Sequence, residues 1–155
     1  MAILSDFVGA WAGTNGFRLM PGDPLTEFPA AATVTVAAGG HLTSVGYSWR
    51  HPDDGPQDGL VVLGSAGDDG SLVAMWADSW HQQPVPMSLS GRPGVDAGVE
   101  LAGGYGDGWG WRVGFEATGD GGLRMRMDNV IPEEQATAEI SAGPYPVMVM
   151  DLRRA

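Results

Sequence analysis

The sequence predicts an all-β protein: a single up-and-down antiparallel β-barrel of about ten strands, spanning residues 1–155. Short runs of alternating apolar and polar residues are separated at close intervals by Gly, Asp, Asn and Pro, which is typical of strands joined by hairpin turns. No apolar stripe of helical period persists for three turns, and 25 glycines and 11 prolines would interrupt most candidate helices. Short connections favour pairing of neighbouring strands, and closure removes exposed edges. A β-sandwich, which needs some long crossing connections, is the alternative.

The expected strands follow the alternation and end at turn residues. AATVTVAA at 31–38 alternates cleanly before Gly39-Gly40, and TGDGG at 118–122 separates the eighth strand from the ninth. Segments 21–29 and 51–59, rich in Pro, Gly and Asp, are expected to be loops. In chain order the expected strands are Phe7–Met20, Ala31–Ala38, His41–Arg50, Leu60–Gly64, Leu72–His81, Pro86–Ser90, Val99–Gly103, Gly108–Ala117, Leu123–Val130 and Pro146–Arg154.

Composition limits the possible partners and compartment. A chain of 155 residues is long enough for one domain with one core. The net charge of −11, with no lysine among the bases, opposes binding to nucleic acid or an anionic membrane. The absence of cysteine excludes disulfides and thiolate nucleophiles and fits a reducing, cytoplasmic compartment. No export signal and no run of about 18 apolar residues is present, so we expect a soluble protein.

Three short motifs carry a resemblance to a known family. FVGAWAGTNG at 7–16 has a Gly-x-Trp pattern on the first expected strand, and AMWADSWHQQPVPMSLSG at 74–91 and RMRMDN at 124–129 follow later. The chain resembles an uncharacterised bacterial family of calycin-like barrels, related to lipocalins and nitrobindins, over nearly its whole length. The resemblance implies that Trp11 plugs the closed end of the barrel and that Arg153 or Arg154 packs across its ring. Such a cation–π contact contributes about 0.5 to 2 kcal/mol.

The three histidines, His41, His51 and His81, form no metal-ligand pattern. No pair has H-x-H or H-x-x-x-H spacing, and there is no cysteine, so we expect no metal. Nitrobindins bind haem through a histidine near the C-terminal strand, whereas no histidine follows His81 here. We therefore expect neither haem nor any other cofactor. His41 and His51 are interpreted as ordinary residues at a strand start and in a solvated turn.

Aromatic, acidic, hydroxyl and imidazole groups crowd into residues 76–81. On a continuous strand Trp76 and Asp78 would share one face, and Met75 and His81 would share the other. Asp78 and His81 would then point apart unless the strand bulges, which argues against a local Asp–His catalytic couple. Without a nucleophile–base–orienter set, we expect no enzyme, although a cavity enzyme of isomerase or cyclase type using His81 as acid–base is an alternative.

Several strands present large aromatic residues or methionines on one face, which we expect to point inward. These faces either fill a solid core or line a cavity for a small apolar or aromatic molecule. Arg112, Arg124, Arg126 and Asp128 alternate with them and are expected outside; with the opposite parity, Arg124 and Arg126 would form an interior anion clamp. The candidate ligand-binding residues are Asn15, Tyr47, Trp49, Met75, Trp76, His81, Trp111, Met125 and Met127.

Small-molecule binding in the cavity is the function that these observations favour, with the physiological ligand left open. Asn15, Tyr47 and His81 would supply the polar contacts near the open end. A filled barrel acting as a scaffold, with a possible homodimer, is the remaining hypothesis.

Overall fold

Ten antiparallel strands close into a barrel in the computed structural model, which describes residues 2–155. Each strand pairs with the next one in the sequence, and β10 returns to pair with β1, so the predicted up-and-down topology is confirmed. The strands are β1 (Gly9–Phe17), β2 (Thr26–Ala37), β3 (Leu42–His51), β4 (Gly55–Gly64), β5 (Leu72–Asp78), β6 (Gln82–Pro93), β7 (Val99–Gly106), β8 (Trp109–Ala117), β9 (Leu123–Ile131) and β10 (Gly143–Arg154).

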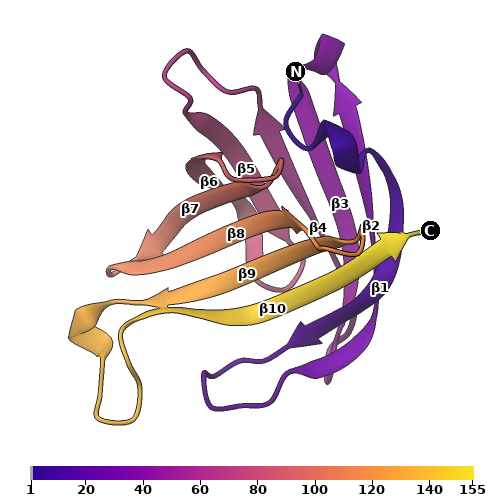
Figure 1. Cartoon of the computed structure of the whole chain (residues 1–155). Helices are drawn as coiled ribbons and strands as arrows, with labels where there is room; N and C mark the ends of the chain where they lie inside the picture. Colours follow the sequence, from indigo (N-terminus) through magenta and orange to yellow (C-terminus); the bar gives the residue numbers. More distant parts are fainter. Residues whose placement is uncertain (1) are drawn as a thin grey trace.

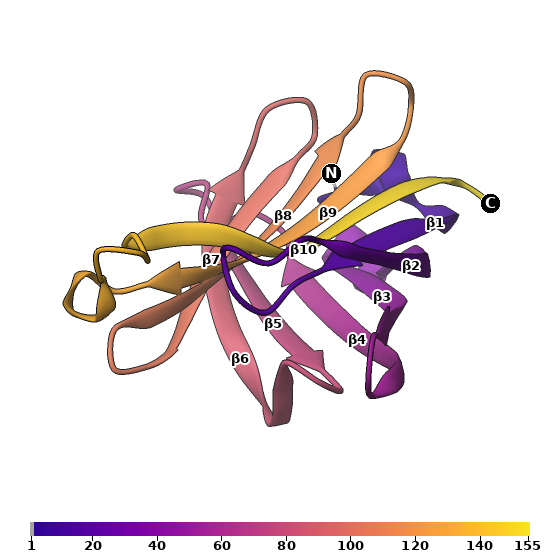
Figure 2. The same cartoon turned by 90° about the horizontal axis from the view of Figure 1, so that it is seen from below.

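The only helical elements among the described residues are three short 3-10 turns, η1 (Ser5–Phe7), η2 (Ala38–Gly40) and η3 (Glu133–Gln135). Within residues 2–155 no helix has the length and apolar character needed to cross a membrane. Strands β8–β10 run at a steep angle to β2–β4, as Figure 1 and the view from below in Figure 2 both show. The C-terminal end of β10 lies beside β1, its partner in the pair that closes the barrel (Figure 1).

Two segments expected to be loops are partly strand. β2 already begins at Thr26 and β4 at Gly55, so the loops before them are shorter than the composition suggested. The prolines within these early portions do not break the pairing, because they lie where a strand has a neighbour on one side only. Pro29 is level with Thr14 of β1 but precedes the first β2–β3 pair, and Pro56 precedes the first β4–β5 pair. The first strand is shorter than the expected Phe7–Met20, since η1 occupies Ser5–Phe7 and β1 ends at Phe17.

Alternation along the strands places the apolar faces inside, as predicted. On β9, Met125 and Met127 are fully buried, and on β8 Trp111 and Phe115 are buried with them. Arg126 of β9 is exposed on the outer face and pairs at 2.7 Å with Asp128, which also lies on this face but is buried and not solvated as expected. The interior anion clamp is thus wrong, because the parity of β9 turns its arginines outward.

Trp11 seals one end of the barrel. Its side chain is 2% exposed, and its Nε1 donates a hydrogen bond to the Phe7 carbonyl at 2.7 Å. The guanidinium of Arg154 lies over the indole, 4.6 Å from the ring centroid, and donates to the carbonyls of Val8 and Asp6. The expected contact between Trp11 and a late arginine is confirmed, and Arg154 makes it. This contact joins the last strand to the N-terminal segment across the closed end.

We expect Trp11→Ala to lower the free energy of unfolding by about 3 to 5 kcal/mol, as large aromatic truncations in cores do. Denaturant titration followed by far-UV circular dichroism measures this change. A variant as stable as wild type would show that the indole is not part of the packed end.

A comparison of adjacent arginines isolates the contribution of the cation–π contact. Arg154→Ala should cost about 1 to 2 kcal/mol, because it removes the contact with Trp11 and two hydrogen bonds to backbone carbonyls. Arg153→Ala, the matched control, removes an exposed ion pair with Asp120 and should cost less than about 1 kcal/mol. Equal losses in a urea titration of the two variants would contradict the assignment.

Candidate functional site

A cavity of about 550 Å³ enters the barrel between β5–β6 and β8–β10. This volume lies in the range of small-molecule pockets. Polar groups of Arg18, His81, Asn129 and Gln135 interrupt an otherwise largely apolar wall. The wall contains six large aromatic residues, Trp76, Trp80, Tyr105, Trp109, Trp111 and Tyr145.

The cavity lies where regular pairing between β6 and β7 ends. Their ladder runs from Pro93–Val99 only as far as Ser90–Ala102. Beyond it, Met87 of β6 and Tyr105 of β7 line the cavity. The barrel is therefore open on this side, where the β6–β7 ladder ends. At the β1–β10 closure, in contrast, the buried Trp11 ring fills the interior.

A buried carboxylate organises the residues next to the cavity. The side chain of Asp78, at the end of β5, is 0% exposed. Its Oδ2 accepts hydrogen bonds from Tyr47 Oη at 2.6 Å and Trp49 Nε1 at 3.1 Å. Its Oδ1 accepts from the backbone N–H groups of Trp80 and His81, each at 2.9 Å. Because both oxygens are occupied, the buried charge is compensated and the surrounding rings are fixed in place.

Burial and hydrogen bonding act in opposite directions on Asp78. Burial raises the pKa of this carboxyl, but its contacts with His81 and the Tyr47 hydroxyl outweigh burial and leave the pKa below its ordinary value. The pKa of the Tyr47 hydroxyl is raised well above its ordinary value, first by burial and then by the negative charge of Asp78. The network therefore consists of an ionised acceptor and a neutral phenol donor.

Glycine at position 59 makes the Tyr47–Asp78 contact possible. Gly59 stands opposite Tyr47 on β3 and opposite Asp78 on β5. A methyl group there would lie 2.2 Å from Cζ and Oη of Tyr47. Only a residue without a side chain lets the phenol lie across β4 and reach the carboxylate. Tyr47 Oη also accepts a hydrogen bond from Trp76 Nε1 at 2.9 Å.

The turn after β5 brings His81 back beside Asp78. The β5–β6 register shifts between Trp76 and Asp78, and Asp78 then pairs with Gln82, so residues 79–81 form the turn. Asp78 accepts from two backbone N–H groups of this turn, a standard role for aspartate. As a result His81 Nδ1 lies 3.4 Å from Asp78 Oδ1. The expectation that the two residues point apart is wrong, because the strand ends before His81.

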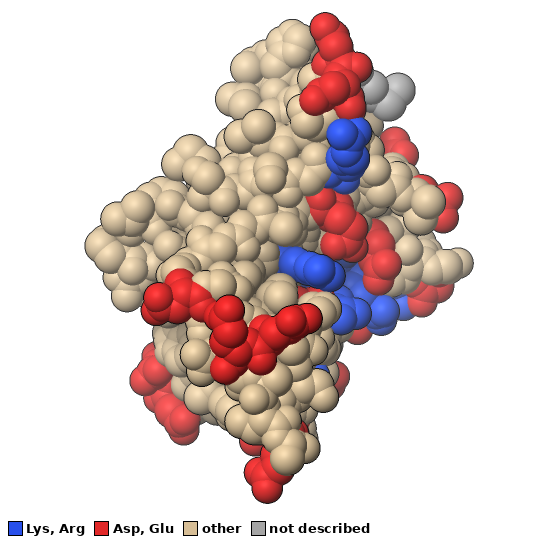
Figure 3. Space-filling model, turned by 90° about the vertical axis from the view of Figure 1, so that its left-hand side faces the viewer, with Lys and Arg blue, Asp and Glu red and all other residues tan. Residues whose placement is uncertain are grey.

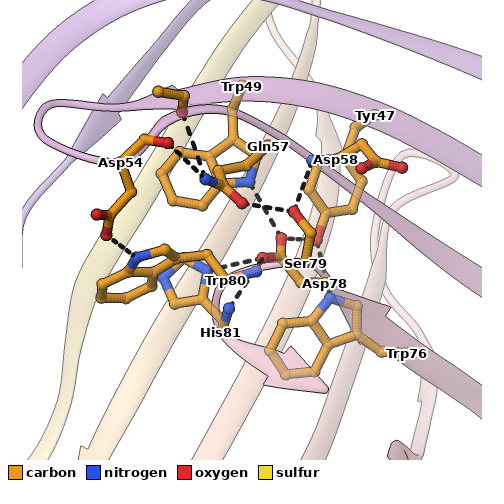
Figure 4. A network of polar contacts seen from close by, with 11 residues as sticks. Tyr47, Trp49, Asp54, Gln57, Asp58, Trp76, Asp78, Ser79, Trp80 and His81 are labelled. Carbon is orange, nitrogen blue, oxygen red and sulfur yellow. Dashed lines mark hydrogen bonds and ion pairs between the residues drawn. The ribbon is translucent and has the colours of Figure 1, made fainter. Parts of the chain in front are cut away.

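Hydrogen bonds from the β3–β4 hairpin hold this turn in place (Figure 4). Trp80 Nε1 donates to Asp54 Oδ2 at 2.7 Å, and Ser79 Oγ donates to Gln57 Oε1 at 2.7 Å. Ser79 Oγ also accepts from the backbone N–H of Asp58. The turn that carries His81 is therefore fixed by Asp78 on the inside and by the β3–β4 hairpin on the outside.

Two histidines are buried among aromatic rings. The His81 side chain is 6% exposed, and its ring lies 5.1 Å from that of Trp49 and 5.2 Å from that of Trp111, measured between centroids. Neither nitrogen of His81 has a hydrogen-bond partner within the described chain. His51, expected in a solvated turn, instead ends β3 and is buried against Phe17 and Trp80. Its Nδ1 accepts from the backbone N–H groups of residues 53 and 54 and so carries no proton.

The structure brings three of the candidate residues, Trp76, His81 and Trp111, together at the cavity wall. The rings of Trp76 and Trp111 stack, with centroids 4.9 Å apart and planes inclined by 10°. Trp111 Nε1 is buried and has no hydrogen-bond partner in the described chain, and the same holds for both nitrogens of His81. These are the buried side-chain polar atoms near the cavity that the described chain leaves unsatisfied.

The remaining candidates lie elsewhere. Tyr47 and Trp49 stand behind the wall as donors to Asp78 and do not line the cavity. Met125 and Met127 belong to the packed core. Asn15 is buried away from the cavity, with both amide atoms unpaired. Met75 is 52% exposed on the outer face of β5, because its parity is opposite to that of Trp76.

Most residues of the cavity wall were not among the sequence candidates, and the fold supplies them from distant segments. Tyr105 lies at the end of β7, Tyr145 at the start of β10, and Arg18 directly after β1. Trp109 shares the parity of Trp111, which was the available signal for it. Nothing in the local sequence marks the others, since ladder lengths and hairpin positions place them at the same end of the barrel.

Charged side chains occupy the outer surface. Arg124 pairs with Asp151 at 2.6 Å and lies near Glu116, and Arg126 pairs with Asp128. Figure 3 shows one face of the molecule, where several basic side chains gather next to one another with acidic side chains around them. Within residues 2–155 no group of three or more His, Asp or Glu side chains is placed to hold a metal ion.

No protein-family model matches the sequence, and no curated protein matches it. The geometry of the cavity and of the Asp78 cluster therefore carries the functional argument.

The depressed pKa of Asp78 makes stability depend on pH. A carboxyl whose folded-state pKa lies below its ordinary value of 3.8 stabilises the fold above about pH 4, and this contribution is lost as the pH falls through the lowered folded-state value. Asp78→Asn should lower the free energy of unfolding at pH 7 by about 2 to 3 kcal/mol, the scale of hydrogen bonds to a charged group. The difference from wild type should shrink in urea titrations carried out below pH 4.

Asp58→Asn is the matched control, since Asp58 is an exposed carboxylate on β4 one residue from Gly59. It should change stability by less than about 0.5 kcal/mol. A loss for Asp78→Asn that equals the control, or that persists unchanged at acid pH, would contradict the assigned role.

Proposed function

We propose that the protein binds a small, largely apolar or aromatic molecule that carries a hydrogen-bonding group, inside the cavity at the open side of the barrel. The observation that carries this proposal is the coincidence of a cavity of about 550 Å³ with two wall residues, His81 and Trp111, whose buried ring nitrogens have no partner in the described chain. Buried polar groups are nearly always paired, and leaving one unpaired costs about 1 to 3 kcal/mol. A ligand that supplies the missing partners recovers that free energy.

The neighbouring polar groups differ from those of His81 and Trp111, because they have hydrogen-bond partners. In the same cluster Tyr47, Trp49 and Trp76 all have hydrogen-bond partners for their ring N–H or O–H groups. Among the described residues of this cluster, only His81 and Trp111 lack partners for buried ring nitrogens. The aromatic wall provides large flat surfaces, which suit a planar apolar ligand. A binding site accounts for both features, whereas a barrel filled only to stabilise the fold accounts for neither.

The resemblance to calycin-like barrels supports the same proposal. A closed antiparallel barrel and the contact of Arg154 with Trp11 are the features that this resemblance implied. We infer from them that the chain is a calycin-like barrel whose cavity holds a small molecule in the cytoplasm. The charged outer surface, with basic groups paired to acidic ones, favours a small-molecule ligand over a nucleic acid.

N-phenylnaphthylamine, an uncharged aromatic dye with one N–H group, tests the proposal. We expect binding at micromolar strength, about −8 kcal/mol, with quenching of tryptophan emission because four indoles line the cavity. Trp111→Ala should weaken binding more than tenfold through loss of stacking area. His81→Ala should weaken it severalfold, the scale of one hydrogen bond.

Met75→Ala is the control, because Met75 lies on the outer face of the strand that carries Trp76. Its affinity for the dye should equal that of wild type, and a similar loss there would place the dye outside the barrel. At about 100 micromolar, a micromolar ligand must also raise stability by about 2 to 3 kcal/mol through mass action. Absence of both quenching and thermal stabilisation would leave the scaffold or homodimer hypothesis in its place.

A further inference from the structure

We propose that His81, oriented by Asp78, is a general base that removes a proton next to the carbonyl group of a cavity-bound aromatic ketone, while Trp111 Nε1 donates a hydrogen bond to the carbonyl oxygen. This inference rests on the proposed binding function and adds a reaction to it. The three groups come from β5, the turn after it and β8, and only the closed barrel brings them together.

The base and its orienting group have the required arrangement. Asp78 Oδ1 lies 3.4 Å from His81 Nδ1, and although the two atoms form no hydrogen bond, the charge of the nearby carboxylate favours the tautomer with the proton on Nδ1. Nε2 is then the nitrogen with a free lone pair, and no group of the described chain uses it. The carboxylate itself accepts hydrogen bonds from Tyr47, Trp49 and two backbone N–H groups. Asp78 is therefore a positioning residue and does not compete for the proton.

The third component stabilises negative charge on oxygen. Trp111 Nε1 is a donor with no acceptor in the described chain, and its ring centroid is 5.2 Å from that of His81. Rings at this separation can contact one carbonyl group and its adjacent carbon, with each hydrogen-bond or proton-transfer contact about 3 Å long. Stacking on Trp76 holds the Trp111 indole in place. A preorganised donor in a site with little water is effective in this role.

The step is balanced within the substrate and the imidazole. The bond between the α-carbon and hydrogen breaks, and its electron pair stays on the substrate as an enolate whose oxygen is held by Trp111 Nε1. The proton passes to His81 Nε2. Return of a proton from Nε2 to the same carbon gives solvent exchange, and return to a conjugated carbon gives isomerisation. No oxidant, reductant or metal is needed.

β-Tetralone in deuterium oxide is the probe, because it is a bicyclic aromatic ketone with exchangeable α-hydrogens. Proton NMR follows loss of the α-hydrogen signals, and tryptophan quenching measures binding in the same samples. Wild type should accelerate exchange at saturating ketone at least about a hundredfold over buffer, and Met75→Ala should match it. His81→Gln should return the saturated rate to near background. Trp111→Phe, which keeps an aromatic ring without the N–H, should lower it at least about tenfold.

Asp78→Asn separates positioning from folding. It should lower the saturated exchange rate while the affinity for β-tetralone stays within about threefold of wild type, because Asp78 does not contact the cavity. If Asp78→Asn does not fold, His81→Gln and Trp111→Phe still decide the proposal.

The possible failures are distinguishable. If β-tetralone quenches tryptophan emission and exchange remains at the buffer rate, or is equal in wild type and His81→Gln, the acid–base role is overturned and the binding function stands. If N-phenylnaphthylamine binds but β-tetralone does not, an aromatic ketone is the wrong substrate class and the proposal falls. If neither compound binds, the proposed function fails with it.

Discussion

Pairing of β1 with β10 is the constraint on which the rest of the structure depends. It converts ten hairpin-linked strands into a barrel without free edges, so that every strand has neighbours on both sides over part of its length. Arg154 reinforces this closure by crossing from the end of β10 to Trp11 and to the carbonyls beside it. Once the sheet is closed, alternation along each strand separates an apolar interior from a charged exterior, and the interior has one packed end and one open side.

Burial of the Asp78 carboxylate is the second organising feature. A charge inside a barrel is tolerated only when its oxygens are satisfied, and here four donors from two segments, β3 and the turn after β5, converge on it. The same hydrogen bonds that compensate the charge fix Tyr47 and Trp49 and shape the turn that carries His81. Stability and site geometry are therefore coupled at this residue, and Gly59 is part of the arrangement because a side chain there would displace Tyr47.

Unsatisfied buried polar atoms occur both at the cavity and elsewhere in the core. Asn15 shows that such an atom is not by itself a binding site, since it lies away from the cavity. His81 and Trp111 differ because they share a cavity wall with stacked indoles and a fixed carboxylate. Together they place polar ring nitrogens at one end of an otherwise largely apolar pocket. It favours a ligand with a flat apolar body and a polar group at the end that faces β5 and β8.

The sequence by itself determined the fold class, the approximate strands and the inward faces, because period-two alternation and turn residues are local properties. It also identified Trp76, His81 and Trp111. Tertiary structure alone decided that Tyr105, Tyr145 and Arg18 join them, since ladder lengths and closure set which strand ends meet. It likewise decided that Asp78 lies beside His81. Parity along a continuous strand argues against that contact, and only the register shift that ends β5 at Asp78 turns the chain back and brings the imidazole to the carboxylate.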